Sequence, residues 1–550
     1  MKRRHQFLFL LIPLFLLLTA CADELPDVSS NPDNSNEENF EPAGNEDETL
    51  IVGISNNIDS MNPFFKNGLV STYVQRFFYE SILNMKGPTE FEPRLGEFTT
   101  EDNQTFQLSL VEDATWSDGE PVTTEDVYYT INTIADPDTL TSLGMRIAMI
   151  EGTDENGKRV DGEEELSGLE IIDDYTMTIQ TKEPVDLNYL SEFLGFQVMI
   201  APEHVFSEID PADLQTSDPA IHPTVTGGPY EFVENKEDNY LHLTANENYY
   251  RGAPNIKDIY FRVLDGVSIV TELQSGNIDM TAGAGIGVVP DEDIPLIEEI
   301  EHLSVESSVG SGIQYMVINH DRERFQDPKV RRALAYAIDQ EMAFENLLHG
   351  NGELTPTMYT SMNPYKNEDI EPIPYDPEEA KRLLEEANFD FSEPVQIMVP
   401  TGNVAREQMA DLTQQWLQSI GMTVEQEKYD FTTWLSKARE GEFDLGFVGQ
   451  SHTYEPNVQN NFGTGGASNY GNISDPVLDQ YIEEGTQGIT FEERKPIYDE
   501  MQEYFVETMP AVPLYTEAEY IIKDQRLVGG AKPFFQATTN DVHEWHFTNE

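Results

Sequence analysis

The sequence has almost no cysteine, because Cys21 is the only one in 550 residues. A disulfide framework and a cysteine nucleophile in the body of the protein are therefore excluded. After residue 20 no apolar run reaches the roughly 20 residues that a membrane helix needs. The chain also lacks a Gly-x-Ser-x-Gly elbow, a Walker-type phosphate loop and a dinucleotide-binding glycine pattern. These absences predict a protein without enzymatic activity, catalytic residues, a resident metal or a cofactor.

Basic residues are scarce as well. Asp and Glu number 101 against 32 Lys and Arg, which gives a formal net charge of -69. Nucleic acid is excluded as a partner, because binding it requires a positive surface. Such self-repulsion destabilises a compact state at low ionic strength and is screened by salt. The sequence therefore predicts an acidic, halophilic-type surface suited to a saline exterior. A merely acidic exported protein is the alternative.

The N-terminus has the layout of a secretory signal peptide. A positive head at residues 2–4 precedes an apolar stretch from 7 to 18, with small residues before Cys21. An uncleaved membrane anchor is the alternative. The segment "LTAC", which ends at Cys21, resembles a bacterial lipobox, and this resemblance makes Cys21 the lipid attachment point. Residues 22–49 contain no Lys or Arg and predict a disordered acidic tether, with a reach of about 30 Å.

Helices and strands alternate over the remaining chain, so the fold class is α/β. Apolar periodicity predicts strands over residues 50–54, 104–110 and 259–263, and a helix over 71–85. Thr123 and Asp126 form a capping-box pattern, and Asp327 and Asp376 each precede a proline at the first helical position. Asn388 suits the left-handed position after the helix that Asp376 begins. Trp416 and Trp434 are expected in the core, with the ligand cleft as the alternative for Trp434.

Several stretches, taken in order, resemble one known family. They are "TWSDGEPVTTEDV", "GGPYEF", "NENYYRGAP", "LQSGNIDM", "INHDRERFQDPKVRRALAYAID", "YDPEEAKRLLEEANF" and "MPAVPLY". Together they resemble the extracellular solute-binding proteins of ABC importers, in the oligopeptide- and dipeptide-binding family (family 5). The resemblance covers about residues 50–550.

The resemblance implies a two-lobed periplasmic-binding-protein fold (type II-like), with an extra inserted domain and a ligand cleft between the lobes. Residues 1–20 are then the signal peptide, and 21–49 the lipidated cysteine and tether. Lobe I is discontinuous and combines 50–88, 220–315 and 516–550. The inserted domain takes 89–219, and lobe II takes 316–515.

The same resemblance implies where a ligand is held. An extended peptide would lie between loop 67–72 and the segment 448–472, which is rich in Gly, Ser, Asn and aromatic residues. The expected ligand contacts are Leu69, Val70, Gln450, Ser451, His452, Tyr454, Glu455, Asn457 and Asn469. Glu455 precedes Pro456 where the family often has an Asp that pairs with the peptide ammonium, so Glu455 is the candidate for that role. A solvated acid at a turn is the alternative.

The implied function is that of a lipid-anchored, monomeric binding subunit on the extracellular face of the cell membrane. It would capture oligopeptides by hinge closure and deliver them to the permease subunits of an ABC importer. The same scaffold binding an oligosaccharide or a nickel or other metal chelate is the alternative, because Gln450 and Glu455 depart from the family pattern. An enzyme or a signalling receptor subunit is a third hypothesis. A hydrolytic rate that is lost on changing Ser451 or His452 would favour the enzyme.

Overall fold

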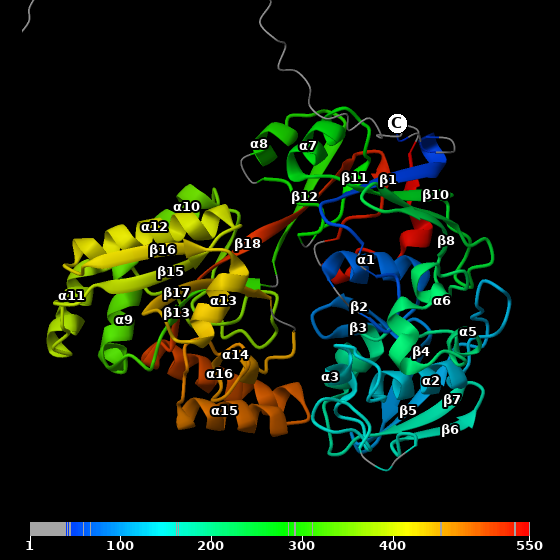
Figure 1. The fold of residues 1–550 in the computed structure, drawn as a ribbon, viewed down its shortest axis with the longest axis horizontal. Helices are drawn as coiled ribbons and strands as arrows, with labels where there is room; N and C mark the ends of the chain where they lie inside the picture. Colours follow the sequence, from blue (N-terminus) through cyan, green and yellow to red (C-terminus); the bar gives the residue numbers. More distant parts are fainter. Residues whose placement is uncertain are drawn as a thin grey trace, which may run out of the picture. The chain divides into compact units, whose positions relative to one another are not determined.

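The structure is a computed structural model that describes Phe40, Pro42 and residues 46–548, apart from 59, 66–67, 161, 163, 284, 291–292, 311, 452–453 and 533–534. The signal peptide, Cys21, most of the tether and His452 lie outside the described residues. Residues 43–550 form one compact unit. This unit has the predicted two-lobed α/β fold (Figure 1). Among the described residues, no helix is both long enough and apolar enough to cross a membrane.

One long strand is common to both lobes. β18 (Ala511–Asp524) pairs through its first half with β13 (Gly312–Ile318) and β14 (Gly352–Leu354). Its second half pairs with β12 (Leu303–Val309) and β11 (Met280–Thr281). The resulting sheet has twelve strands. Ten of them follow the order β16-β15-β17-β13-β18-β11-β1-β10-β9-β8, and β12 and β14 each pair with β18 beside this path. In Figure 1, β18 runs from one group of strands to the other.

The first lobe contains the β1 side of this sheet. β1 (Thr49–Ile54) lies parallel to β10 (Asp258–Val263), which is followed by β9 (Tyr240–Ala245) and β8 (Tyr230–Lys236). The predicted strands over 50–54 and 259–263 are therefore confirmed. The helices of this side are α1 (Leu69–Phe78), α7 (Gly266–Gln274) and α8 (Ile294–Ile297).

The helix predicted over 71–85 was too long. α1 ends at Phe78, because Tyr79 is extended, and the chain turns into β2 (Leu83–Gly87). The Ile82 carbonyl accepts hydrogen bonds from the backbone N–H groups of Arg94 and Gly96, at 3.0 and 3.2 Å. These long-range bonds replace the helical ones that the apolar spacing suggested.

A separate four-stranded sheet follows in the chain, and we call residues 89–219 around it the inserted region. Its order is β4 (Gly96–Thr100), β5 (Thr105–Leu110), β7 (Thr176–Gln180) and β6 (Leu169–Asp173). Strand β5 confirms the prediction over 104–110. The capping box at Thr123 and Asp126 is present and begins α2 (Thr124–Ala135). The remaining elements are β3 (Glu90–Pro93), α3 (Gly144–Ile147), α4 (Leu187–Leu190), the π-helix η2 (Ser191–Phe196), α5 (Glu203–Phe206), η3 (Pro211–Thr216) and the first half of α6 (Asp218–Ile221).

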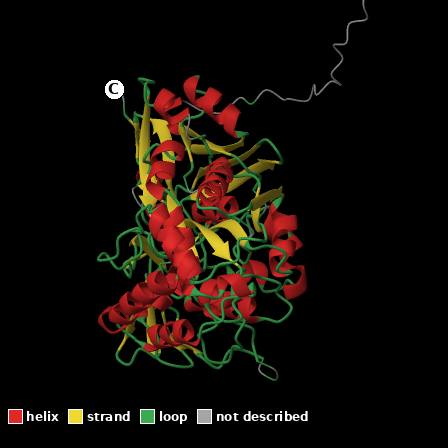
Figure 2. Cartoon of the chain, turned by 90° about the vertical axis from the view of Figure 1, so that its left-hand side faces the viewer, coloured by secondary structure: helices red, strands yellow, loops and turns green. Residues whose placement is uncertain are grey.

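The second lobe is a sheet with a hydrophobic core on each face. Met316 and Ile318 of β13 face one core, and Tyr315 and Val317 face the other, as the two-residue period of a strand requires. Its other strands are β15 (Val395–Pro400), β16 (Val424–Tyr429) and β17 (Leu445–Ser451). Figure 2 shows helices on both sides of the strands. The helices of the second lobe are α9 (Pro328–Ala337), α10 (Gln340–Leu347), α11 (Pro377–Glu386), α12 (Val404–Ser419), α13 (Phe431–Arg439), α14 (Gln459–Phe462), α15 (Pro476–Gln487) and α16 (Phe491–Thr508).

The caps predicted for this lobe are confirmed. The carboxylates of Asp327 and Asp376 accept backbone hydrogen bonds at the starts of α9 and α11, and Asn388 has a φ of 52°. Trp416 and Trp434 are both buried, so the core prediction holds for each. The exact lobe boundaries drawn from the sequence stay a prediction.

Candidate ligand-binding site

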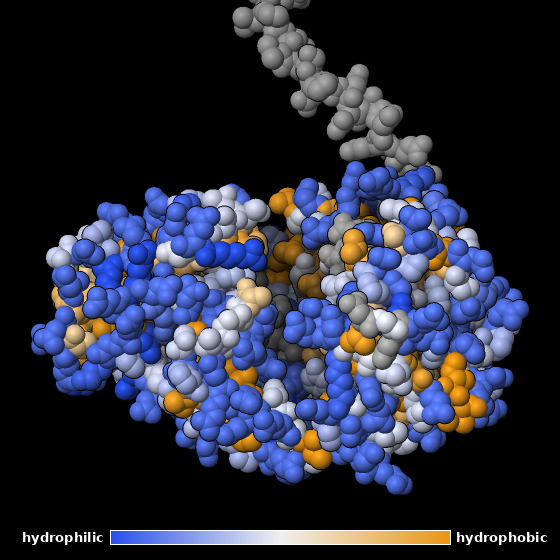
Figure 3. Space-filling model, turned by 60° about the horizontal axis from the view of Figure 1, so that its bottom comes forward, coloured by the Kyte–Doolittle hydropathy of each residue, from blue (hydrophilic) through white to orange (hydrophobic). Residues whose placement is uncertain are grey.

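Polar side chains gather at one edge of the second-lobe sheet. Strands β15, β16 and β17 run parallel, so their carboxyl ends meet at this edge, which is where ligands bind in open α/β sheets. Figure 3 shows that one face of residues 43–550 is hollowed and that hydrophobic side chains lie inside the hollow. Charged and polar side chains cover most of the surrounding surface in that view.

β17 brings the first predicted contacts to this edge. The Gln450 side chain is half-buried, and its Oε1 accepts a hydrogen bond from the Tyr315 hydroxyl at 2.9 Å. Ser451 pairs with Gly312 of the neighbouring strand, and His452 lies outside the described residues. Gln450 is therefore the one of these three residues whose side chain is described at this edge.

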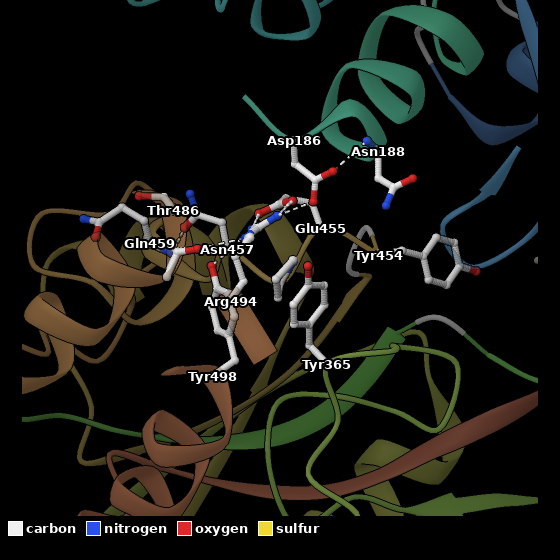
Figure 4. Close-up of polar contacts among 12 residues, drawn as sticks. Asp186, Asn188, Tyr365, Tyr454, Glu455, Asn457, Gln459, Thr486, Arg494 and Tyr498 are labelled. Carbon is white, nitrogen blue, oxygen red and sulfur yellow. Dashed lines mark hydrogen bonds and ion pairs between the residues drawn. The ribbon is translucent and has the colours of Figure 1, made fainter. Parts of the chain in front are cut away.

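Glu455 lies against an arginine of α16. Arg494 donates hydrogen bonds from Nη1 to Oε2 of Glu455 at 3.1 Å and from Nη2 to Oε1, as Figure 4 shows. The guanidinium also donates from Nε to the Gly485 carbonyl at 2.9 Å and lies 5.2 Å from the Tyr365 ring centre. Burial raises the pKa of Glu455, and the charge of Arg494 opposes that rise. Glu455 is therefore bonded to a cation within the protein, and its role as the partner of a peptide ammonium stays a prediction.

The inserted region adds two more acids to the same place. Asp186 accepts the backbone N–H of Asn188 at the start of α4, and its Oδ2 lies 3.6 Å from Arg494 Nη1 (Figure 4). Glu192 of η2 is 4 % exposed and accepts hydrogen bonds from the backbone N–H groups of Tyr454 and Glu455. Burial and the neighbouring Glu455 raise the pKa of Glu192 to about 8.

Tyr454 joins the second lobe to the other parts of the unit. Its ring packs against Met85, Phe196 and Ala537, and its hydroxyl donates to Gln536 Oε1 at 3.3 Å. The loop that begins at Tyr454 therefore lies where the inserted region, the first lobe and the second lobe meet.

The remaining predicted contacts differ in exposure. Leu69 is 59 % exposed at the first turn of α1, whereas Val70 is buried. Asn457 is exposed and accepts the Gln459 backbone N–H at 2.8 Å. Asn469 is buried, and its amide bonds to Gly463 and Ile473 within its own loop. Leu69 and Asn457 are thus the more accessible members, and ligand contact stays a prediction for all of them.

Comparison with known proteins decides the family. Residues 90–472 match the profile described as "Bacterial extracellular solute-binding proteins, family 5 Middle". The chain belongs to this family. It is similar to the oligopeptide-binding protein AppA of Bacillus subtilis, with 24 % identity over 81 % of this chain and 80 % of that protein. It is also similar to the periplasmic oligopeptide-binding protein OppA of Salmonella typhimurium, with 24 % identity over 85 % and 87 %.

Solved structures agree with the fold of this family 5 protein. The ABC transporter substrate-binding protein CtaP of Listeria monocytogenes superposes with a TM-score of 0.80 at 21 % identity, over 91 % of this chain and 99 % of that one. AppA of Bacillus subtilis, in complex with a nonapeptide, superposes with a TM-score of 0.73 at 20 % identity, over the same shares. The family to which the chain belongs consists of solute-binding proteins.

Sequence reasoning missed the partners of Glu455 and a second polar group at the same sheet edge. Arg406 Nε donates to Gln314 Oε1 at 2.8 Å, and Gln314 and Asn403 both donate to the Glu517 carboxylate. An added Cβ at Gly449 would lie 2.5 Å from the end of the Gln314 side chain, so a larger residue there would displace this group. The signal was available: Asn403 and Arg406 directly follow β15, at the carboxyl end of a strand parallel to β17.

Proposed function

We propose that this family 5 chain is the membrane-anchored extracellular substrate-binding subunit of an ABC importer and that it captures oligopeptides between its lobes by hinge closure. The family match over residues 90–472 carries the proposal, together with a polar site at the carboxyl ends of β15 and β17. Two similar proteins are named as oligopeptide-binding. An extended peptide held through its main chain suits a sheet edge, because backbone hydrogen bonds give affinity without selecting side chains.

The proposed contacts are those at the sheet edge and opposite it. Glu455 is the proposed partner of the peptide ammonium, because it stands where the family often has an Asp in that role and because Arg494 holds its carboxylate in place. The other proposed contacts are Leu69, Val70, Gln450, Ser451, His452, Tyr454, Asn457 and Asn469. The proposed partners are the permease subunits of the importer.

The anchor and the surface complete the proposal. Cys21 carries the lipid, and residues 22–49 hold the monomeric body near the membrane. The net charge of -69 supports adaptation to a saline exterior. A Cys21→Ser chain expressed in a Gram-positive host should move from the membrane fraction to the medium, and membrane retention of that variant would contradict the lipid anchor.

A metal chelate is the second candidate ligand. Haem-binding protein A of Haemophilus influenzae is 26 % identical over 64 % of this chain and 64 % of that protein, and NikZ of Campylobacter jejuni is a structural neighbour solved with Ni(L-His). An oligosaccharide is the other alternative ligand on this scaffold. Among the described residues, no group of three or more His, Cys, Asp or Glu side chains could hold a metal, so a chelate would bring its own ligands.

Native mass spectrometry tests the proposal. The body from Glu48 onward is purified in high salt and offered a random peptide mixture. We expect the protein to retain peptides of a few residues. Glu455→Gln should weaken this binding, and the exposed control Glu298→Gln should leave it unchanged. Retention that both variants preserve would discard Glu455 as the contact. No retained peptide at any salt that keeps the protein folded would favour the chelate or the sugar.

A further inference from the structure

Five buried or partly buried charged groups meet where the inserted region touches the second lobe. Asp186, Glu192 and Arg146 come from the inserted region, and Glu455 and Arg494 come from the second lobe. Arg494 bonds to Glu455 and lies 3.6 Å from Asp186, and Arg146 is close enough to Glu192 to lower its pKa. The cluster therefore joins two parts of the chain through charged groups on both sides.

These groups are withdrawn from water. Arg494 and Glu192 are each 4 % exposed, and Asp186 is 7 % exposed. Buried charges are costly unless each has an opposite partner. The cluster has three acids and two guanidinium groups, so one negative charge is left over when all three acids are ionised.

A proton removes that excess at the lowest cost on Glu192. Asp186 and Glu455 both face Arg494, whereas Glu192 faces Glu455, which raises its pKa, and Arg146, which lowers it. The tyrosines around the cluster do not supply a charge, because burial raises their pKa values. These tyrosines are Tyr189, Tyr359, Tyr365, Tyr454 and Tyr498, and Glu519 adds a further carboxylate near Tyr454. Glu192 is thus the group on which protonation balances the cluster.

We propose that this cluster is a clasp between the inserted region and the second lobe, and that closing the clasp takes up one proton at Glu192. The inference rests on the proposed function in one respect, since it requires the two parts to separate and close as a hinged binding protein does. It adds a control by pH to that motion.

The direction of the pH dependence follows from the two states of Glu192. With the parts separated, Glu192 is in water and has an ordinary pKa near 4.3. In the clasp, burial and Glu455 raise the pKa of Glu192 to about 8. Closure is then fully favoured below about pH 4, and its equilibrium constant falls about tenfold per pH unit up to about pH 8, after which it is level.

Distance measurement between two spin labels tests the clasp without any ligand. The body from Glu48 has no cysteine, because Cys21 is the only one in the chain. Leu140→Cys in the inserted region and Val477→Cys on α15 are both exposed positions for labels. The closed fraction should fall between pH 5 and 8 in 1 M NaCl. Glu192→Gln should abolish this dependence and stay closed at pH 9, whereas the exposed control Glu183→Gln should behave as the parent.

Three results would overturn the clasp: one unchanging distance at every pH, a pH dependence retained by Glu192→Gln, or the loss of that dependence in Glu183→Gln. Should Glu192→Gln fail to fold, Asp186→Asn serves instead. Removing that acid reduces the excess charge, so the closed fraction should persist to higher pH, and an unchanged midpoint would overturn the clasp. Distances that shift with pH in a protein that retains no peptide would leave the clasp standing and refute the proposed peptide function.

Discussion

The pair formed by Arg494 and Glu455 gives the sharpest stability prediction. Arg494→Met removes two hydrogen bonds to Glu455 and leaves that carboxylate buried beside Asp186. Breaking a buried ion pair from one side costs about 3–5 kcal/mol of unfolding free energy. Adding Glu455→Gln to the same chain removes the stranded charge, so the double variant should recover a large part of that loss. The bond from Arg494 to the Gly485 carbonyl is lost in both variants and does not enter the coupling energy.

Urea unfolding in 1 M NaCl measures this cycle of four proteins. The coupling between the two changes should be about 2 kcal/mol or more, because the residues are in direct contact. The control is the exposed pair Lys437 and Glu442, whose atoms lie 2.7 Å apart and which should show no measurable coupling in the same cycle. If Arg494→Met costs less than about 1 kcal/mol, or if the two single changes simply add, the argument that Glu455 depends on Arg494 is wrong.

Three further predictions concern packing and charge. Gly227→Ala places a Cβ 2.8 Å from the buried Trp116 ring and should lower the unfolding free energy by about 1–3 kcal/mol. Gly119→Ala is the comparison, because that position has open space around it but a φ of 94°, so only backbone strain acts there. Trp434→Ala empties a fully buried site and removes the hydrogen bond from Nε1 to the Met398 carbonyl. It should lower the free energy of unfolding in urea by about 3–5 kcal/mol, and Trp434→Phe should lower it less. Raising NaCl from 0.1 to 1 M should raise the melting temperature, because the net charge is -69, and an unchanged melting temperature would contradict the halophilic surface.

The local elements were predictable where one short signal decides them. Asp327 and Asp376, each followed by proline, mark the starts of α9 and α11, since the cap and the fixed φ of proline act within one turn. The end of α1 was not predictable in this way. Its apolar spacing continues to Ile82 and Leu83, but the backbone there bonds to Arg94 and Gly96, which no local pattern reveals.

The candidate site was likewise predictable only where a local signal decides it. The loop after β17 could be located from the family resemblance, and Glu455 lies there at the meeting point of the three parts of the unit. Its pairing with Arg494 could not be predicted, because 39 residues separate the two and Arg494 lies among charged residues that suggest a solvated helix face. The approach of Asp186, from the inserted region, depends on how the parts pack and has no signature in the sequence.

Both lobes need β18, which lies near the end of the chain, to complete their sheets. β13, β14, β12 and β11 all bond to residues 511–524, so a chain that stops before residue 511 leaves each of these strands with unpaired backbone groups. Exposed strand edges of this kind pair with other chains and aggregate. In the proposed export of this chain, the requirement is met only once the C-terminus has crossed the membrane. A fragment that ends before residue 511 should therefore aggregate or be degraded, and no half-sized binder should accumulate.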